Sequence, residues 1–379
     1  MSSQNPSAKK IRDVSSSSQE PIVPRLIGEL ETMILARFPM TEHWKLGCLN
    51  KQFQAQLKSG EIYEIRREIG FKEPCVFMLE SEQGNWSALD RHFKSCRKLP
   101  LIPTIIPSVY SFSCGNNGSF SAGTHLFVQG WEAGEYSVWR YDLATNKWSK
   151  APPMNSPRCL FASASHDIFA FVAGGLETKT YSEVLSSAEK YNAKSQSWKT
   201  LPRMIRERKF CSGCYMDNKF YVIGGQDEQK NNLTCGEFFD EETNSWTLVP
   251  NMLKDIIPLS TSRSPPPFAV VNNKLYTLDA SSNEVKLYMK GTNSWKKLGP
   301  VPIKANTQEG PWSGDLGTAF KSLGNELLLI GANSASYSHT LMSVYTCCPD
   351  PDVENLQWRE IVCRNTDHHS FDICAVMFA

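Results

Sequence analysis

Paired cysteines and histidines are the residues of this sequence whose types and spacing could hold a metal ion. Cys211 and Cys214 have the spacing of one half of a zinc site, and Cys347-Cys348 and His368-His369 are further pairs. No second Cys-x-x-Cys or His pair follows Cys214 at zinc-finger distance. Cys211 also begins a strand-like stretch in which such side chains take packing positions. The sequence therefore predicts no metal site and no cofactor.

Basic residues form the second group that could do chemistry. Arg203, Arg206, Arg208 and Lys209 stand close together and could pair with an acidic segment of another protein through bidentate hydrogen bonds. Arg158 and Arg208 each follow a methionine by four residues, so they recur in register, which also fits a structural role bridging neighbouring repeats. Arg206 is off register and is the better functional candidate.

One aromatic residue joins these arginines as a candidate for target binding. Trp312 lies in a long loop, residues 306–314, and residues 255–267 form another such loop. A tryptophan exposed in a loop resembles a binding anchor, although Trp312 could equally pack beneath its own loop. The candidate target-binding residues are therefore Arg158, Arg206, Arg208 and Trp312.

The elements that must position these residues follow from a repeat. Four tryptophans are separated by 50, 48 and 49 residues, and an aromatic residue precedes each by seven: Tyr141 and Trp148, Tyr191 and Trp198, Phe239 and Trp246, Tyr288 and Trp295. A period near 50 is typical of arrays of four-stranded units. Short apolar runs indicate buried strands, Gly-Gly pairs mark tight backbone packing, and Asn/Asp-rich linkers indicate hairpin turns.

The period extends to both sides and predicts a closed ring. Further units lie at residues 326–358 and 73–100, and in the latter Cys96 stands where the others have tryptophan. This unit lacks a first strand, whereas residues 372–378 form a strand-like run without a unit of their own. The C-terminal run should therefore complete the first unit, closing six blades and removing free sheet edges.

A different pattern precedes the strands. Residues 1–20 are Ser-rich and polar, which predicts a disordered tail. Residues 21–70 carry apolar residues at helical spacing: Leu26, Leu30, Ile34 and Leu35, then Leu46, Leu49 and Phe53 in a second helix, then a third helix at 62–69. The predicted organisation is a tail (1–20), a helical module (21–70) and a β-propeller (71–379).

Composition limits the classes of binding partner and the cellular compartments that are expected. The formal net charge is +1, which argues against broad binding to nucleic acid or to an anionic membrane surface. No apolar run is long enough to span a bilayer and the first 20 residues lack the apolar core of a signal peptide. We therefore expect a soluble intracellular protein, in the nucleus, the cytoplasm or both, with its twelve cysteines reduced.

Two motifs in order resemble a known family. Gly-Gly, then an aromatic residue and Asp or Asn, then Trp about seven residues on, resembles the kelch repeat over residues 73–379. Pro24-Arg-Leu-Ile-Gly-Glu-Leu, the following Leu/Ile pair, Pro39, and Leu46-Gly-Cys-Leu-Asn-Lys-Gln-Phe53 resemble an F-box. An F-box followed by kelch repeats is similar to the plant F-box/kelch-repeat proteins. The resemblance implies a mainly β fold: a six-bladed kelch-type propeller after a small α-helical F-box module.

The resemblance also implies a non-catalytic role as substrate-recognition subunit of a Skp–cullin–F-box ubiquitin ligase. The F-box would bind a Skp-type adaptor, and through it the cullin and the RING protein, while the propeller would hold an unknown target protein. The residues expected to bind the adaptor are Pro24, Leu26, Leu30, Ile34, Leu35 and Pro39. The alternative for each of them is a place in the core of the module itself.

Two other functions compete with this one. Gly28 stands where F-boxes commonly have an acidic residue, and Thr32 where leucine is usual, which keeps open a non-degradative scaffold with a vestigial F-box. Some kelch propellers are copper oxidases, with Tyr, His and Cys ligands at the channel mouth. The seven histidines here show no pair in register, so an oxidase is disfavoured.

Overall fold

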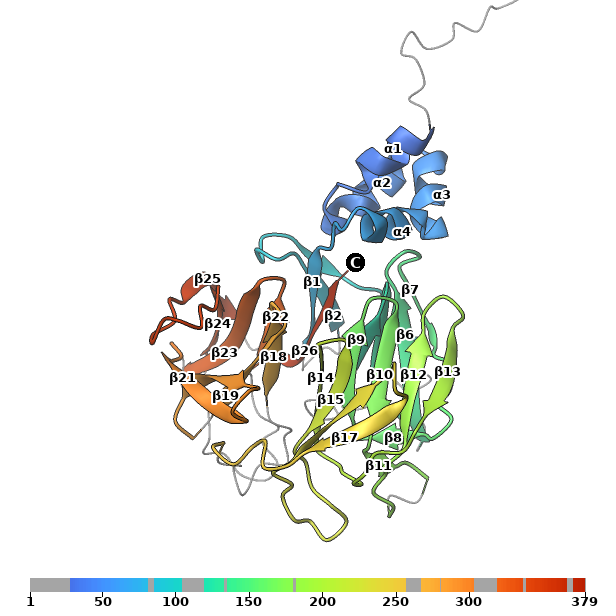
Figure 1. Ribbon diagram of the computed structural model, residues 1–379. Coiled ribbons are helices and arrows are strands. Elements are labelled where there is room, and N and C mark those ends of the chain that lie inside the picture. The colour runs from blue at the N-terminus through green and yellow to red at the C-terminus, as the bar shows by residue number, and fades with distance from the viewer. Residues whose placement is uncertain are drawn as a thin grey trace, which may run out of the picture.

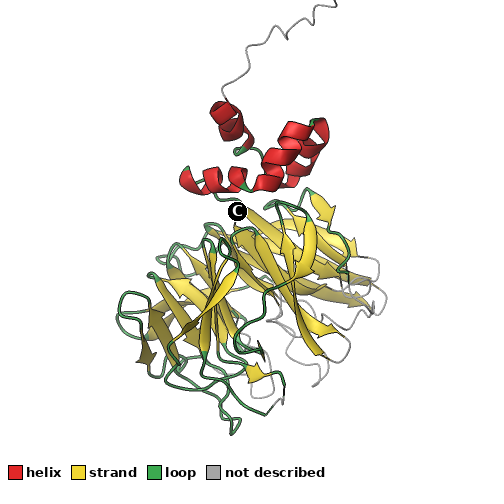
Figure 2. Cartoon of the chain, turned by 90° about the vertical axis from the view of Figure 1, so that its right-hand side faces the viewer, coloured by secondary structure: helices red, strands yellow, loops and turns green. Residues whose placement is uncertain are grey.

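The computed structural model arranges the chain as a ring of four-stranded sheets with a helical module at one end (Figures 1 and 2). It describes residues 28–80, 85–103, 119–132, 135–179, 182–256, 267–279, 281–302, 319–336, 339–366 and 371–378. The predicted tail, Pro24, Leu26 and Trp312 lie outside these residues.

Each sheet of the ring is called a blade, numbered in chain order. Blade 1 contains β26 (Phe371–Phe378), β1 (Pro74–Glu80), β2 (Asn85–Leu89) and β3 (Cys96–Lys98), and blade 2 contains β4 (Ser119–Ala122), β5 (His125–Glu132), β6 (Glu135–Asp142) and β7 (Lys147–Lys150). Blade 3 contains β9 (Ala162–His166), β10 (Phe169–Ala173), β12 (Ala188–Asn192) and β13 (Ser197–Leu201). Blade 4 contains β14 (Ser212–Met216), β15 (Lys219–Ile223), β16 (Gly236–Asp240) and β17 (Ser245–Val249).

The remaining blades follow the same order. Blade 5 contains β18 (Phe268–Val271), β19 (Lys274–Asp279), β20 (Glu284–Met289) and β21 (Ser294–Pro300). Blade 6 contains β22 (Ala319–Leu323), β23 (Glu326–Ser336), β24 (His339–Cys347) and β25 (Arg359–Thr366). A small ladder pairs β8 (Arg158–Cys159) with β11 (Leu176–Glu177) at the end of blade 3.

The C-terminal strand closes the ring. β26 pairs antiparallel with β1, from Pro74 opposite Phe378 to Glu80 opposite Phe371. The first strands of successive blades contact one another around the whole circle: β26 with β4, β4 with β9, β9 with β14, β14 with β18, β18 with β22, and β22 with β26. The predicted six-bladed propeller, completed by the C-terminal strand, is therefore confirmed.

The repeated aromatic pairs have a direct structural explanation. In blades 2 to 5 each tryptophan lies opposite the aromatic residue seven positions earlier, across the hairpin that joins the third and fourth strands, with ring centroids 5.1 to 5.4 Å apart. In blade 1 the same positions hold Leu89 and Cys96, as predicted. The indole N–H of each tryptophan donates to a carbonyl just after the preceding blade: Pro100, Pro152, Pro202 and Met252.

The helical module comprises α1 (Gly28–Leu35), the 3₁₀ turn η1 (Met40–Glu42), α2 (His43–Leu49), α3 (Lys51–Ser59) and α4 (Glu61–Glu68). The apolar stripe from Leu46 to Phe53 was expected to form one helix, and the structure corrects this. Asn50 has an extended backbone, and its side chain accepts a hydrogen bond of 2.7 Å from the Phe53 amide. Asn50 therefore ends α2 and caps α3.

Buried contacts join the helical module to blades 1 and 2. Met40 and Tyr63 pack in the hydrophobic cluster that contains Trp86 and Trp148. Arg66 is fully buried and donates to the Glu73 carboxylate at 3.0 Å, just before β1. None of the described helices is long and apolar enough to span a membrane.

Candidate functional site

Helix α1 has a row of exposed apolar side chains. Leu30 and Ile34 are 48% and 47% exposed, and Met33 and Phe38 are also exposed. Met33 and Ile34 lie three and four residues after Leu30, on one side of the helix, and Phe38 follows the end of α1. Pro39 is exposed at the end of this segment. Exposed apolar side chains gathered on one face mark an interaction surface, and we call Leu30, Met33, Ile34, Phe38 and Pro39 the α1 face.

Leu35 has a different place from its predicted partners. It is only 4% exposed and packs with Ala36, Leu57 and Ile62 in the core of the helical module. Of the residues expected to bind an adaptor, Leu30 and Ile34 are exposed on one side of α1, Pro39 is exposed beyond the end of the helix, and Leu35 is turned inward. Leu35 therefore occupies a position in the core of the helical module, which was the alternative considered for it.

Thr32 also points inward. It is 4% exposed, and the Gln56 side-chain amide donates to its hydroxyl at 3.3 Å. This departure from the usual leucine therefore changes a contact between α1 and α3 inside the module. It leaves the chemistry of the α1 face unchanged.

Arg158 and Arg208 are enclosed by their own blades. The Arg158 guanidinium donates to the Glu189 carboxylate at 2.7 Å and to the Gly174 and Ser187 carbonyls. Both side chains of this ion pair are at most 1% exposed. Burial lowers the pKa of Arg158, and Glu189 opposes that effect.

The same arrangement recurs in blade 4. Arg208 donates to Glu237 at 2.5 Å and to the Gly224 and Cys235 carbonyls, and both charged side chains are 0% exposed. The Arg208 backbone carbonyl also accepts a hydrogen bond from the Gly175 amide of blade 3. The side chains of Arg158 and Arg208 are buried and have no surface that a target could contact. We therefore assign both arginines a structural role, which their recurrence in register also indicates.

Glu237 has a second task, which is to shape an exposed loop. Its two carboxylate oxygens accept hydrogen bonds from the backbone amides of Ile205 and Arg206, at 2.7 and 3.1 Å. This holds the backbone of both residues while their side chains remain exposed, with Ile205 56% exposed. Neither Arg203 nor Arg206 forms an ion pair with a described residue. The pKa of Asp227 is lowered first by the hydrogen bond from the Asn231 side chain, and the Arg206 charge adds to this effect.

Glu189, Glu237 and Ile205 are not among the residues predicted from the sequence. The two glutamates do carry a signal, because they stand at the second position of the third strand in adjacent blades and one repeat period apart. Each lies two residues before the aromatic partner of its blade's tryptophan, and in blade 5 the residue two before Tyr288 is Lys286, whose ammonium pairs with Asp279 at 2.5 Å. Blade 5 therefore has the opposite charge at this position of the repeat.

The α1 face and the exposed loop lie at opposite ends of the propeller (Figure 1). The β9–β10 turn meets the helical module, where Asp167 lies 3.9 Å from both Arg67 and Lys72. The Arg158 and Arg208 loops enter β9 and β14 at the other ends of those strands, near β8 and β11. We call the described part of this second end, residues 151–161, 174–179, 182–187, 202–211 and 224–235, the loop face.

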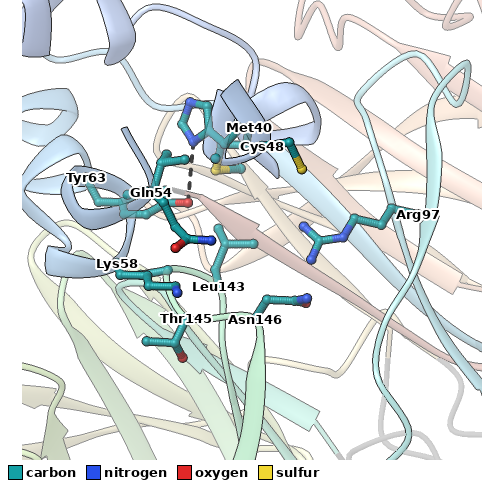
Figure 3. Close-up of a pocket in the computed structure, with 13 residues that line it drawn as sticks. Met40, Cys48, Gln54, Lys58, Tyr63, Arg97, Leu143, Thr145 and Asn146 are labelled. Carbon is teal, nitrogen blue, oxygen red and sulfur yellow. Dashed lines mark hydrogen bonds between the residues drawn. The ribbon is translucent and has the colours of Figure 1, made fainter. Parts of the chain in front are cut away.

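A pocket of about 210 Å³ lies between the helical module and the propeller (Figure 3). Met40, Leu57, Tyr63 and Leu143 supply apolar parts of its wall, and Lys58, Arg97 and Asn146 supply polar ones. His43 also lines it, and burial together with Arg66 lowers its pKa to about 4. We call this space the junction pocket.

The cysteine pair lies in packing positions. Cys211 and Cys214 are buried in two different hydrophobic clusters, and burial raises their pKa values to about 11 and about 12. Among the described residues, no three His, Cys, Asp or Glu side chains converge as metal ligands would.

Comparison with known proteins identifies the family. The family model of the kelch motif matches residues 108–155 and 207–253. The F-box/kelch-repeat protein At3g27150 of Arabidopsis thaliana is 48% identical over 94% of this chain and 83% of its own length. The Arabidopsis F-box/kelch-repeat proteins At1g26930 and SKIP11 are 36% and 38% identical, over 85% and 80% of this chain and 76% and 64% of their own lengths. With this order of helical module and propeller, the chain belongs to the plant F-box/kelch-repeat proteins.

Proposed function

We propose that this protein is the substrate-recognition subunit of a Skp–cullin–F-box ubiquitin ligase. The observation that carries the proposal is the α1 face, an apolar surface on an F-box module with Leu30 and Ile34 half exposed. A partner that covers this face would remove that apolar area from water. The Skp-type adaptor would occupy it and connect the protein to the cullin and the RING protein.

The loop face is the proposed site for the target protein. Ile205 and Arg206 stand on a backbone that Glu237 already orders, so binding there costs little further conformational entropy. Their side chains suit a target segment that carries an apolar residue beside a carboxylate. The protein would contribute proximity alone, because the ring holds the target at one end and the α1 face anchors the adaptor at the other.

Adaptor capture tests the first half of the proposal. The full-length protein should co-purify with a purified Skp-type adaptor, and Leu30→Glu or Ile34→Glu should reduce binding at least about tenfold, because each places a charge in an apolar interface. Val353→Glu changes an exposed apolar residue of the propeller and serves as the matched control. If the wild-type protein fails to bind the adaptor, the ligase role is wrong and the scaffold alternative takes its place.

Target capture tests the second half. The full-length Leu30→Glu variant should retain bound targets in plant cells because it cannot pass them to the ligase, and proximity labelling would identify them. Adding Arg206→Glu should remove those proteins from the labelled set. Adding Lys199→Glu, an equal charge change on an exposed residue of β13, should leave them. Equal labelling with Arg206→Glu would show that the target binds elsewhere.

A further inference from the structure

The junction pocket is formed jointly by the two parts of the chain. Gln54 and Lys58 come from α3 of the helical module, Arg97 from β3 of blade 1, and Asn146 from the turn between β6 and β7 of blade 2. Lys58 and Arg97 lie on opposite sides of the space in Figure 3. A ligand between them would therefore contact the helical module and the propeller at once.

The charges of this pocket are unbalanced. None of the described residues that line it is an aspartate or a glutamate. Lys58 and Arg97 are both cationic at neutral pH, and neither forms an ion pair with a described residue. His43 is neutral there, because its pKa is lowered to about 4. A concave site that holds two unpaired cations over an apolar floor concentrates positive potential and attracts anions.

Hydrogen-bond donors complete the arrangement. The Tyr141 hydroxyl donates to Asn146 Oδ1 at 2.8 Å, which orients the amide and leaves Asn146 Nδ2 as a donor. The nearest carboxylate of the turn, that of Asp142, is engaged by the Thr145 hydroxyl at 2.8 Å and the Ala144 amide at 3.0 Å. The polar wall thus offers an ammonium, a guanidinium and amide N–H groups, which are the groups that bind phosphate and carboxylate oxygens.

We propose that the junction pocket binds a compact polyanion, a small phosphate ester or polycarboxylate, that bridges the helical module and the propeller. The volume is below the ~300–1,000 Å³ of pockets that enclose drug-sized ligands, so the ligand is small. By neutralising Lys58 and Arg97 together, it strengthens the attachment of the helical module to blades 1 and 2. This site is independent of the α1 face and of the loop face.

Calorimetric titration of the full-length protein with sodium pyrophosphate and with citrate tests the proposal, at about physiological ionic strength so that non-specific attraction of anions to exposed charges is screened. One or both anions should bind saturably at one site per chain, and comparison of the two distinguishes a phosphate site from a carboxylate site. Sucrose, which is uncharged, should not bind. Lys58→Ala and Arg97→Ala should each weaken binding about tenfold or more, because each removes a charge-assisted hydrogen bond.

Lys98→Ala is the matched control, since Lys98 is an exposed neighbour of Arg97 on β3 and does not line the pocket. Its affinity should equal that of the wild type. The proposal is overturned if neither anion binds saturably. It is also overturned if Lys58→Ala binds as tightly as the wild type, or if Lys98→Ala loses as much affinity as Lys58→Ala. Lys58 is exposed on α3, so its variant decides the question even if Arg97→Ala fails to fold. Adaptor capture by the α1 face should be the same in all these variants.

Discussion

The Arg208 guanidinium and the Glu237 carboxylate form a fully buried ion pair in blade 4, with a nitrogen–oxygen distance of 2.5 Å. The same carboxylate accepts hydrogen bonds from the backbone amides of Ile205 and Arg206. In this ion pair the two buried charges compensate each other. Through it, the segment between blades 3 and 4 is bound to the third strand of blade 4, and the backbone of the exposed loop at Ile205 and Arg206 is held in place. Arg158 and Glu189 repeat the arrangement in blade 3, where Asn155 and Ser156 supply the amides.

Arg208→Met should destabilise the protein by about 3–5 kcal/mol, because it leaves the Glu237 carboxylate buried without its counter-charge. Urea unfolding followed by tryptophan fluorescence measures the change. Arg206→Met, two residues earlier on an exposed side chain, is the control and should cost less than about 0.5 kcal/mol. A loss below about 1 kcal/mol for Arg208→Met would contradict the structural role given to this residue.

Trp198→Phe should cost about 1 kcal/mol through the hydrogen bond that it removes. The indole N–H of Trp198 donates to the Pro152 carbonyl at 3.0 Å, whereas phenylalanine keeps an aromatic ring opposite Tyr191 but cannot donate. Trp246→Phe removes the equivalent bond to Pro202 one blade further on, and should cost a similar amount. Because the two hydrogen bonds join different pairs of blades, the double variant should lose the sum of the two. A combined loss smaller than either single loss would show that the indoles do not join the blades independently.

The repeat made the propeller predictable because each spacing has a local cause. The seven-residue spacing of Tyr191 and Trp198 is that of a hairpin that places the two rings opposite each other, so the pattern survives in any blade that keeps the pairing. The sequence showed both that the first unit lacks a strand and that the C-terminal run has no unit of its own. In the structure this run is β26, and it pairs with β1 of the first unit. The break at Asn50 was missed because the apolar stripe continues across it, and only the backbone of Asn50 reveals the cap.

The candidate sites were less predictable, because burial depends on contacts between distant segments. Arg206 and Arg208 look alike in the sequence, yet Arg208 is buried by Glu237, 29 residues later, and Arg206 is not. Leu35 and Ile34 are neighbours in one stripe, and the packing of α1 on Leu57 and Ile62 decides which of them faces inward. The junction pocket combines residues of the helical module, of β3 and of the turn between β6 and β7, and no local pattern links them.

Substitutions at Leu35 and Leu30 should separate stability from binding. Leu35→Ala removes a buried side chain from the core of the helical module and should cost about 2–5 kcal/mol. Leu30→Ala changes an exposed residue, so it should leave stability within about 0.5 kcal/mol of the wild type while weakening adaptor capture. Thermal unfolding and adaptor pull-down, measured on the same preparations, check both results. Stability loss in Leu30→Ala equal to that in Leu35→Ala would show that Leu30 also belongs to the core.

Acid should destabilise the junction between the helical module and the propeller through His43. Burial, followed by the nearby Arg66 charge, lowers the pKa of His43 from 6.5 to about 4, so the folded protein prefers the neutral ring. Between these two values the unfolded chain binds a proton that the folded chain refuses, so stability is full above pH 6.5 and falls as the pH drops towards 4. The slope for one such group is at most about 1.4 kcal/mol per pH unit.

Comparison with His43→Gln isolates this contribution from the other groups that titrate in the same window. Glutamine keeps a polar side chain that can meet the Phe38 carbonyl, which lies 3.0 Å from His43 Nε2, and it carries no titratable ring. The free energy of unfolding of the variant should therefore depend less steeply on pH between 6.5 and 4 than that of the wild type. His92→Gln replaces an exposed histidine and should keep the wild-type slope. Parallel pH profiles for the wild type and His43→Gln would mean that His43 takes up its proton without cost to the folded state.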